Sequence, residues 1–474
     1  MGDRLVNDRA VSAPSSRRTR LPLISLCIGY IMVILDATIV TVALPPIGRE
    51  FPTAGGDLSG VQWVADGYTV IFAALLLSAG SIGDRFGGRS VFQVGLALFV
   101  VTSAGCGLAP SLGFLIAMRL LQGVAAALVV PTSLALIRAS YPDRVSRARA
   151  IGVWGMMGGL AAASGPVLGG LLVAALGWRA VFFVNLPIGV LGLLMTARHV
   201  VAPRPVRTSR LDAPAQFLAV GTLGGLAYGI IEAGHAGWTA PGVLGALAAA
   251  VLCLVAFLLR ESRATDAMLP LHLFRDAAFS SATAIGFLMN VGFYGQLFVV
   301  SFYFQQYRHD GVLLAGLAML PQTAMVAVSS ALGGRLTARS GPRAPMLVGL
   351  VTGALGFLGL LVAGRTTPYA VLVLPLAAIG FGTAFTMPAA VAAVVESAPG
   401  DRAGLASGVL NASRQVGSAM GVAVLGALVA QGSDFAAGMR TGAWISAACF
   451  LAGAVLALAG GDGQHGEEPR GIPA

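Results

Sequence analysis

The chain has 474 residues, of which 56% are hydrophobic and 11% are charged, and its mean hydropathy is +0.83. A soluble domain usually carries about 25% charged residues, so this composition excludes a soluble protein built around one large core. The formal net charge of +10 does not indicate nucleic-acid binding, because the arginines gather in short loops between apolar segments.

The first apolar run, residues 21–45, follows a short segment that contains three arginines. A secretory signal peptide begins in the same way, but its apolar core is shorter and a cleavage site of small residues follows. Here the run is long enough to cross a bilayer, contains Asp36 and ends at Pro45-Pro46. We therefore expect it to be retained as the first transmembrane helix.

Further apolar segments recur along the chain, each close to the ~20 residues that an α-helix needs to cross a bilayer. The loops between them are too short to hold a soluble catalytic domain. The sequence therefore predicts an all-α integral membrane protein with about fourteen transmembrane helices. The predicted spans are residues 21–45, 60–82, 90–108, 112–137, 150–176, 179–198, 214–233, 241–260, 277–304, 312–334, 344–363, 369–395, 403–430 and 440–460.

Arginine is distributed unequally between the two sets of loops. Most arginines follow even-numbered spans, on the side of the N-terminus, and cytoplasmic loops are the ones that carry an excess of basic residues. Because the number of spans is even, both termini are predicted to be cytoplasmic. The opposite side holds only Arg49, Arg179, Arg308, Arg365 and Arg440.

The loops after the second and tenth spans are weakly similar. GSIGDRFGGRS begins at Gly80 and GRLTARSGPRA begins at Gly334, with two glycines and two arginines aligned at a constant offset. Two six-span halves, as this repeat predicts, are the architecture of an alternating-access secondary transporter. The predicted parts are a cytoplasmic tail 1–20, an N-terminal bundle 21–199, a cytoplasmic linker 200–213, two inserted helices 214–260, a cytoplasmic loop 261–276, a C-terminal bundle 277–460 and a disordered tail 461–474.

Five stretches in this order resemble the fourteen-span drug:proton antiporter family of the major facilitator superfamily. The resemblance covers about residues 20–460 and implies the alternating-access fold of that superfamily, in the bacterial cytoplasmic (inner) membrane. The stretches are LDATIVTVALP (35–45), GSIGDRFGGRS (80–90), RLLQGVAAALVVP (119–131), SGPVLGG (164–170) and GWRAVFFVNLPIG (177–189).

The loop after the second span joins two helices by a tight turn that glycine allows. The resemblance implies that this loop is a cytoplasmic gate which holds the outward-facing state; the alternative is a basic loop that only sets topology. The sequence departs from the family at Gly88, where a basic residue is usual, and the second copy has Ala338 opposite Asp84. The gating candidates are Gly80, Asp84, Arg85, Gly87 and Arg89.

Three of the charged residues inside predicted spans are candidates for proton coupling, because a charge there is costly and therefore usually functional. Asp36 and Arg119 each lie nine residues from a proline on the outer side, so both are roughly 13 Å deep. We expect Asp36 to exchange a proton as the cavity changes sides; the alternative is a permanent structural pair with Arg119. Asp66 is a second candidate for proton coupling, with an interfacial position held by water as its alternative.

The fifth span carries small residues on adjacent helical faces, which let helices pack closely in lipid, and a proline that kinks a helix. The resemblance adds that this antiporter motif, typical of exporters, tilts during exchange. Its members are Gly165, Pro166, Gly169 and Gly170.

Polar stripes in the ninth and thirteenth spans are expected to face the interior of the bundle. They predict either a lining for the substrate cavity or hydrogen bonds that only join helices, and the aromatic and methionine residues nearby are equally consistent with packing. The cavity candidates are Gln122, Trp154, Met157, Asn290, Tyr294, Asn411, Arg414 and Gln415.

The sequence has no GxxxxGK[ST] nucleotide-binding loop, so ATP coupling is not predicted. The five histidines are scattered along the chain, so neither a metal site nor an enzyme active site is predicted. We expect a proton-coupled antiporter, without a cofactor, that exports hydrophobic or amphiphilic drugs or antibiotics. The alternative is a related carrier of an endogenous metabolite, peptide or siderophore. The expected partners are the bilayer, protons and a small hydrophobic or cationic substrate, with no nucleic acid, and the superfamily implies a monomer.

Overall fold

The structure is a computed structural model in which the described residues form helices and no β-strand. Within the described residues, thirteen helices are long and apolar enough to cross a membrane, or fourteen if a bent pair is counted as one span, in agreement with the predicted number. The predicted tail 461–474 and most of the linker 200–213 lie outside the described residues. The described ranges are 16–52, 58–141, 143–201, 212–264, 268–269, 271–397, 403–431 and 434–460.

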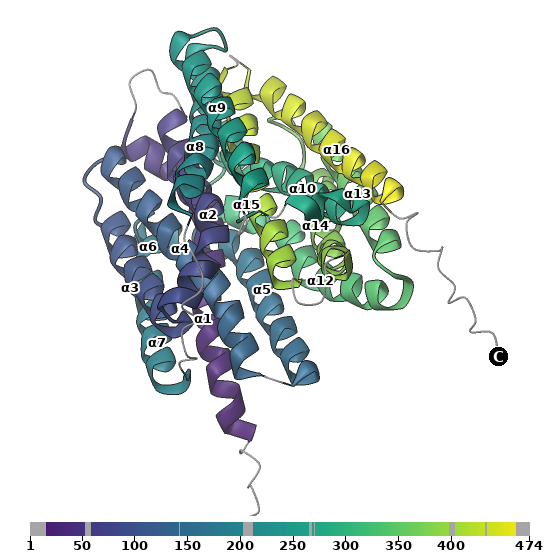
Figure 1. Ribbon diagram of the computed structural model, residues 1–474. Helices are drawn as coiled ribbons and strands as arrows, with labels where there is room; N and C mark the ends of the chain where they lie inside the picture. The colour runs from purple at the N-terminus through teal and green to yellow at the C-terminus, as the bar shows by residue number, and fades with distance from the viewer. Residues whose placement is uncertain are drawn as a thin grey trace, which may run out of the picture.

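The N-terminal half is a bundle in which α1 packs against α4, α5 and α7, while α4 also packs against α2 and α3 (Figure 1). Its helices correspond to the first six predicted spans, with the sixth divided into a short and a long helix. They are α1 (Ser16–Glu50), α2 (Ser59–Phe86), α3 (Gly88–Gly107), α4 (Leu112–Ser140), α5 (Arg144–Leu176), α6 (Ala180–Phe183) and α7 (Asn185–His199).

Helix α1 is longer than predicted at both ends. It begins at Ser16, inside the segment 1–20 predicted as a tail, and it continues through Pro45-Pro46 to Glu50. Proline has no N–H, so these two residues leave the carbonyls of Thr41 and Val42, one turn earlier, without their helical donors. The prediction that the helix ends at Pro45 is therefore wrong. A membrane helix tolerates prolines where other hydrogen-bond donors replace the backbone N–H groups that the prolines lack.

Helix α2 is bent by 61° between its segments Ser59–Leu76 and Ser78–Phe86. A kink weakens the backbone hydrogen bonds around it, and polar groups from a neighbouring helix can replace them. The side-chain amide of Gln216 donates to the carbonyl of Ala74 at 2.8 Å and accepts a hydrogen bond from the hydroxyl of Ser78. The inserted pair of helices thus supports the bend.

The inserted pair consists of α8 (Ala213–Ala236) and α9 (Pro241–Arg263). Helix α8 packs against α2 of the N-terminal half and α15 of the C-terminal half, while α9 packs outside it and is the least buried span. Gly234 makes room for this contact, because a Cβ there would lie 2.8 Å from the Cα of Ala427. Helix α8 therefore covers the seam between the two halves (Figure 1).

The C-terminal half repeats the bundle, with α10 packed on α15 and α16, and α14 packed on α12 and α13. Its tenth predicted span is divided at Met319 into two helices. Its elements are η1 (Leu271–Arg275), α10 (Ala277–Phe302), η2 (Tyr303–Tyr307), α11 (Val312–Ala318), α12 (Leu320–Ser340), α13 (Arg343–Gly359), η3 (Leu360–Val362), α14 (Tyr369–Ser397), α15 (Ala403–Gln431) and α16 (Phe435–Ala459).

Aspartates mark where several helices begin. Asp143, Asp212, Asp276 and Asp434 each accept a hydrogen bond from a backbone N–H in the first turn of α5, α8, α10 and α16, at 2.8–2.9 Å. A side-chain oxygen at this position replaces a partner that the first turn lacks, and its negative charge suits the positive end of the helix. These caps fix the polar boundaries of the spans.

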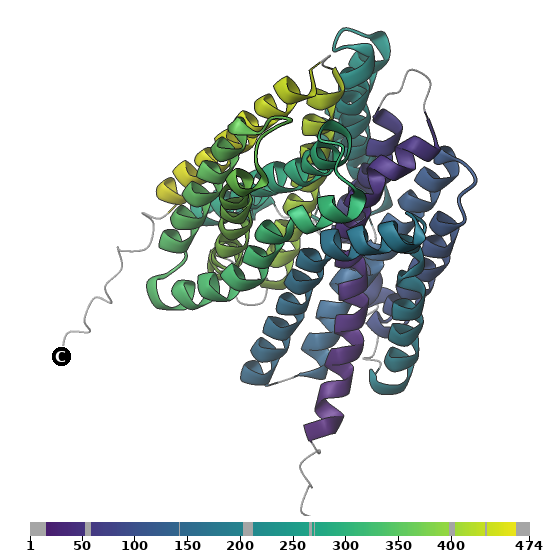
Figure 2. The same ribbon diagram turned by 180° about the vertical axis from the view of Figure 1, so that it is seen from behind.

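The two halves meet through α2 against α15 and α5 against α11 and α12. We call the side where α1 begins the arginine-rich side and the side where α1 ends the far side. The beginnings of α1 and α5, on the arginine-rich side, project away from the C-terminal half in both views (Figures 1 and 2). The contacts described below show that the halves close on the far side.

Candidate transport site

Asp36 and Arg119 form an ion pair inside the N-terminal half. The guanidinium Nη1 of Arg119 on α4 donates to Oδ2 of Asp36 on α1 at 2.5 Å, and the two side chains are 1% and 0% exposed. Arg119 also donates through Nε to the carbonyl of Val64 at 2.9 Å and lies over the ring of Tyr68. The two charges, which the sequence predicts to lie at equal depth, are therefore in direct contact.

Three amide and hydroxyl side chains complete this network. Asn185 Nδ2 and Gln122 Nε2 donate to Oδ1 of Asp36 at 2.9 and 3.3 Å, and both amides also donate to the hydroxyl of Ser103. Gln122 is 0% exposed, so the structure places this cavity candidate in the network rather than on a cavity wall. Both oxygens of Asp36 accept hydrogen bonds, and one of the donors is the guanidinium of Arg119.

Asp66 has the opposite surroundings. Its side chain is 0% exposed, and neither carboxylate oxygen has a hydrogen-bond partner among the described residues. An ionised carboxylate without a donor or a counter-ion is strongly disfavoured away from water, whereas the neutral acid is tolerated. The position therefore suits a protonated carboxyl group.

The neighbours of Asp66 along α2 locate it on the seam between the halves. One turn earlier, Gln62 donates to the carbonyl of Val422 on α15 at 3.4 Å. One turn later, Val70 belongs to an apolar cluster with Ala227 of α8 and Met420 of α15. Residues four apart lie on one helical face, so Asp66 faces the seam of α2 and α15 beneath α8.

The loop between α2 and α3 has the geometry expected of a tight turn. Gly87 has φ +90°, a backbone conformation that residues with a Cβ rarely adopt. Arg89 donates to the carbonyl of Ala197 on α7 at 2.6 Å. Asp84 and Arg85 are exposed, and neither forms an ion pair with another described residue. In this conformation the predicted gate does not join the two halves; Gly80, also in the predicted set, has open space around it.

Glycines of the antiporter motif pack α5 against both halves. A Cβ on Gly165 or Gly169 would lie within 3 Å of Thr38 or Ile39 of α1. Gly170 faces α11, where a Cβ would lie 3.1 Å from the Cα of Gly316. Pro166, the fourth member, contributes its carbonyl to the same α5–α11 contact, 2.7 Å from a Cβ on Gly316. Small residues let the two backbones approach closely here.

Two polar side chains of α10 and η2 join the halves beside this contact. The hydroxyl of Ser301 donates to the carbonyl of Thr41 at 2.8 Å, and Gln305 Nε2 donates to the carbonyl of Val42 at 3.0 Å. These are the carbonyls that Pro45-Pro46 release in α1, so the prolines create the acceptors of this contact. Together with Gly170 and Gly316, these groups form what we call the far-side seal.

Aromatic residues line the approach to the seam from the arginine-rich side. Tyr30 of α1 stacks on Trp154 of α5 with ring centroids 3.7 Å apart, and Trp154 Nε1 donates to the hydroxyl of Ser133 at 3.1 Å. Tyr30, Trp154 and Met157 are all partly exposed. Two of the cavity candidates, Trp154 and Met157, thus lie at an accessible surface of the N-terminal half.

The polar stripes of α10 and α15 come together in the C-terminal half. Ser418 donates to Oδ1 of Asn290 at 3.5 Å, and Arg414 Nη1 donates to Oδ1 of Asn411 at 3.5 Å. Asn290 is 2% exposed and acts mainly as a link between helices. The partly exposed candidates are Tyr294, Asn411, Arg414 and Gln415.

A family model described as Major Facilitator Superfamily matches residues 26–422 and 323–465 of this chain. The chain belongs to the Major Facilitator Superfamily. It is 35% identical over 457 residues to the methylenomycin A resistance protein of Streptomyces coelicolor, covering 96% of this chain and 94% of that protein. It is 38% identical over 409 residues to the tetracenomycin C resistance and export protein of Streptomyces glaucescens, covering 86% and 75%.

Another relative, the puromycin resistance protein of Streptomyces alboniger, is 36% identical over 429 residues, covering 89% of this chain and 83% of that protein. Among solved structures, the human organic anion transporter MFSD10 is similar in fold, with a TM-score of 0.65 at 18% identity, covering 94% of this chain and 100% of that one. This facilitator is therefore a multi-pass membrane protein, and the family and fold predicted from the motifs are confirmed.

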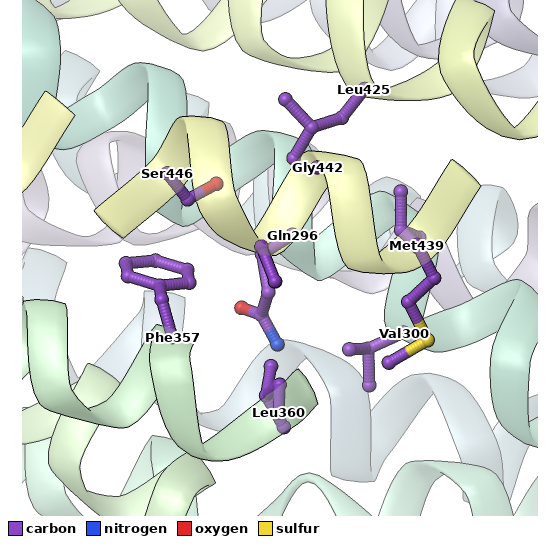
Figure 3. Close-up of a pocket in the computed structure, with 10 residues that line it drawn as sticks. Gln296, Val300, Phe357, Leu360, Leu425, Met439, Gly442 and Ser446 are labelled. Carbon is purple, nitrogen blue, oxygen red and sulfur yellow. The ribbon is translucent and has the colours of Figure 1, made fainter. Parts of the chain in front are cut away.

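The C-terminal half of this facilitator also contains a small pocket between α10, α13, α15 and α16 (Figure 3). Its volume is about 10 Å³, which is room for roughly one water molecule. The amide of Gln296 in its wall exchanges hydrogen bonds with Gln322 at 3.0 and 3.3 Å. The pocket is a packing defect beside an interhelical amide pair and is too small for a drug.

Some residues of the facilitator's site were missing from the sequence-based set. Asn185 lies within the quoted stretch GWRAVFFVNLPIG, so a polar residue in a hallmark motif was the available signal. Ser103, Gly316 and Tyr30 carry no such signal, because their roles depend on which helices face one another.

Proposed function

We propose that this protein is a proton-driven exporter of hydrophobic or amphiphilic drugs or antibiotics. The proposal rests on relatives named for resistance to methylenomycin A, tetracenomycin C and puromycin, each at 35–38% identity over most of the chain. The sequence contains no nucleotide-binding loop, so an ion gradient is the expected energy source. We further propose that the exporter acts as a monomer, without a cofactor or metal and without nucleic acid.

We propose that the arginine-rich side faces the cytoplasm of a bacterial cell, so that both termini are cytoplasmic. The excess of arginine in the loops on that side supports this orientation. With this orientation the far-side seal closes the path to the outside, and the structure corresponds to an inward-facing state. The unpaired, exposed Asp84 and Arg85 agree with a cytoplasmic gate that is open in this state.

We propose that Asp66 carries the coupled proton and that Asp36 and Arg119 hold the N-terminal half together. The observation that supports this assignment is a fully buried carboxyl group on the seam between the two halves, without a hydrogen-bond partner among the described residues. The sequence favours Asp36 as the proton carrier. In the structure, however, both of its carboxylate oxygens accept hydrogen bonds from Arg119, Gln122 and Asn185. A group that must gain and lose a proton needs surroundings that change, and the seam changes when the halves rock.

The cycle follows from the cost of burying a charge. When the far side opens, water reaches Asp66, which lies about two turns from the outer end of α2, and the carboxyl group equilibrates with protons outside. The seam closes around the neutral acid at lower cost than around the anion. For net exchange the proton must then leave to the cytoplasm before the drug-loaded protein opens outward again.

The replacement Asp66→Asn tests this assignment in inside-out membrane vesicles acidified in their lumen. Addition of tetracenomycin C to wild-type vesicles is expected to release protons from the lumen, read by a pH-sensitive dye. In the variant a permanently neutral amide replaces the acid, so drug-dependent proton release should fall by about tenfold or more. Exchange of labelled for unlabelled drug without a gradient should persist, because the seam can still open and close.

The control is Glu232→Gln, which removes a partly exposed acid near the far end of α8. It should release protons like the wild type. Full drug-dependent proton release by Asp66→Asn would exclude Asp66 as the carrier. Loss of both proton release and drug exchange would assign Asp66 a structural role instead.

A further inference from the structure

Few acidic or basic residues lie deep in the described helices. Those more than five residues from either end of a spanning helix are Asp36, Asp66, Arg119 and Arg414. Asp36 and Arg119 compensate each other, and Asp66 is suited to the neutral form. Arg414 is the deep charge that remains.

Arg414 has no counter-ion among the described residues. No carboxylate of the described residues lies within 4.0 Å of its guanidinium, and its Nε has no hydrogen-bond partner. The contact with Asn411 Oδ1, at 3.5 Å, is long for a hydrogen bond to a cation. Arginine keeps its proton in proteins, so the positive charge is permanent. Such a charge near the middle of a membrane-spanning helix is costly and indicates a binding role.

Arg414 lies deep in α15, on the side of the helix that packs against α10. It lies eleven residues into α15 from Ala403, roughly 16 Å from that end of the helix, on the arginine-rich side of the Gln62–Val422 contact. A Cβ placed on Gly286 of α10 would lie 3.2 Å from the Cγ of Arg414, so the side chain packs against α10. The guanidinium is partly exposed and lies within electrostatic range of the Tyr30 hydroxyl.

The opposite wall supplies an apolar surface. Tyr30 and Trp154 form a stacked aromatic pair that is partly exposed, and Tyr294 of α10 also lies within electrostatic range of Arg414. A molecule with an aromatic or apolar body and one acidic group fits this combination, since the body covers the rings and the acid meets the guanidinium.

We propose that Arg414 binds an acidic group of the exported molecule, so that this exporter favours amphiphilic organic anions over cations. The inference rests on the proposed export function and argues against the cationic class within the hydrophobic or cationic substrates expected from the sequence. A cation would need an unpaired carboxylate on the cavity wall, and in the described helices the two deep acids are the paired Asp36 and the enclosed Asp66. A carboxylate, sulfonate or acidic phenol on the substrate would supply the negative charge that no described residue provides to Arg414.

A second partner for Arg414 would be Asp66 in another conformation, because α2 and α15, which carry these two residues, pack against each other. In that case Arg414 would serve proton coupling for every substrate, neutral ones included. A neutral probe therefore separates the two roles.

The test compares three probes that share one aromatic body: 1-pyrenebutanoate, 1-pyrenebutanol and 1-pyrenebutyltrimethylammonium. Their binding to purified protein in lipid nanodiscs is measured by equilibrium dialysis, which requires no proton gradient. The wild type should bind the carboxylate at least tenfold more tightly than the ammonium probe. Arg414→Gln should weaken carboxylate binding about tenfold and leave the alcohol unchanged, whereas Arg414→Lys should retain most of the preference.

Arg440→Gln, which removes an exposed arginine on α16, is the matched control for total charge and should bind all probes like the wild type. A wild type that does not prefer the carboxylate to the ammonium probe overturns the inference. So does an Arg414→Gln variant that loses carboxylate and alcohol equally. Failure of proton-driven transport with the carboxylate preference intact would instead count against the proposed energy coupling.

Discussion

The Gly316→Leu variant is expected to fold and to lose transport by more than tenfold. A Cβ at this position would lie 2.7 Å from the carbonyl oxygen of Pro166 and 3.0 Å from the Cα of Gly170. These are backbone atoms of the opposite half, so they cannot move aside as a flexible side chain would. The larger residue therefore acts as a wedge in the far-side seal and favours the state in which the seal is open.

The size of the effect follows from a two-state equilibrium. Overpacking of a tight contact typically costs about 1–3 kcal/mol, and each 1.4 kcal/mol shifts the ratio of the two states about tenfold. An exporter must visit both states in every cycle, so a shift of this size removes most turnover. The cost falls on the closed seal and not on either half alone, because the clashing backbone atoms belong to different halves.

Spin labels at Gly113 and Thr366, exposed positions on the far side of the two halves, measure the opening. The distance between the labels should increase in Gly316→Leu. Gly311→Leu is the matched control, because a Cβ at this nearby glycine meets nothing within 4 Å. Transport by Gly316→Leu at the wild-type rate, or an unchanged distance distribution, would show that this contact does not limit the closed state.

The spans and the equal depth of Asp36 and Arg119 could be predicted from the sequence for a simple reason. In a helix that crosses a bilayer, position in the sequence converts directly to depth, so counting from Pro45 and Pro110 placed both charges at one level. Counting gives depth but not direction. Whether Gln122 points toward a cavity or toward Asp36 depends on helix rotation and on Asn185 of α7, which depth does not determine.

The prolines of α1 illustrate the other limit. Pro45-Pro46 is a sound signal for a helix end in water, where a broken hydrogen bond is replaced by solvent. Here the helix continues, and Ser301 and Gln305 of the opposite half bind the released carbonyls. The polar stripe of the ninth span predicted only that this helix has a polar face toward the interior of the bundle. It did not identify partners in a segment more than 250 positions away.

Removal of one charge from the Asp36–Arg119 pair is expected to have the second large effect. In Arg119→Leu the carboxylate of Asp36 would remain fully buried with only the amides of Gln122 and Asn185 as donors. Breaking a buried ion pair in this way typically costs about 3–5 kcal/mol, because an uncompensated charge is left behind. The variant should therefore have a clearly lower melting temperature in detergent than the wild type.

The double variant Asp36→Asn/Arg119→Leu decides what the pair does. It removes both charges, and since replacing a complete buried pair is often close to neutral, most of the lost stability should return. If the pair is structural, as the enclosed network indicates, drug-dependent proton release should return with it, because Asp66 is intact. A double variant that melts like the wild type but releases no protons would assign coupling to Asp36. A double variant as unstable as Arg119→Leu would show that the wider network, rather than the charge balance, stabilises the N-terminal half.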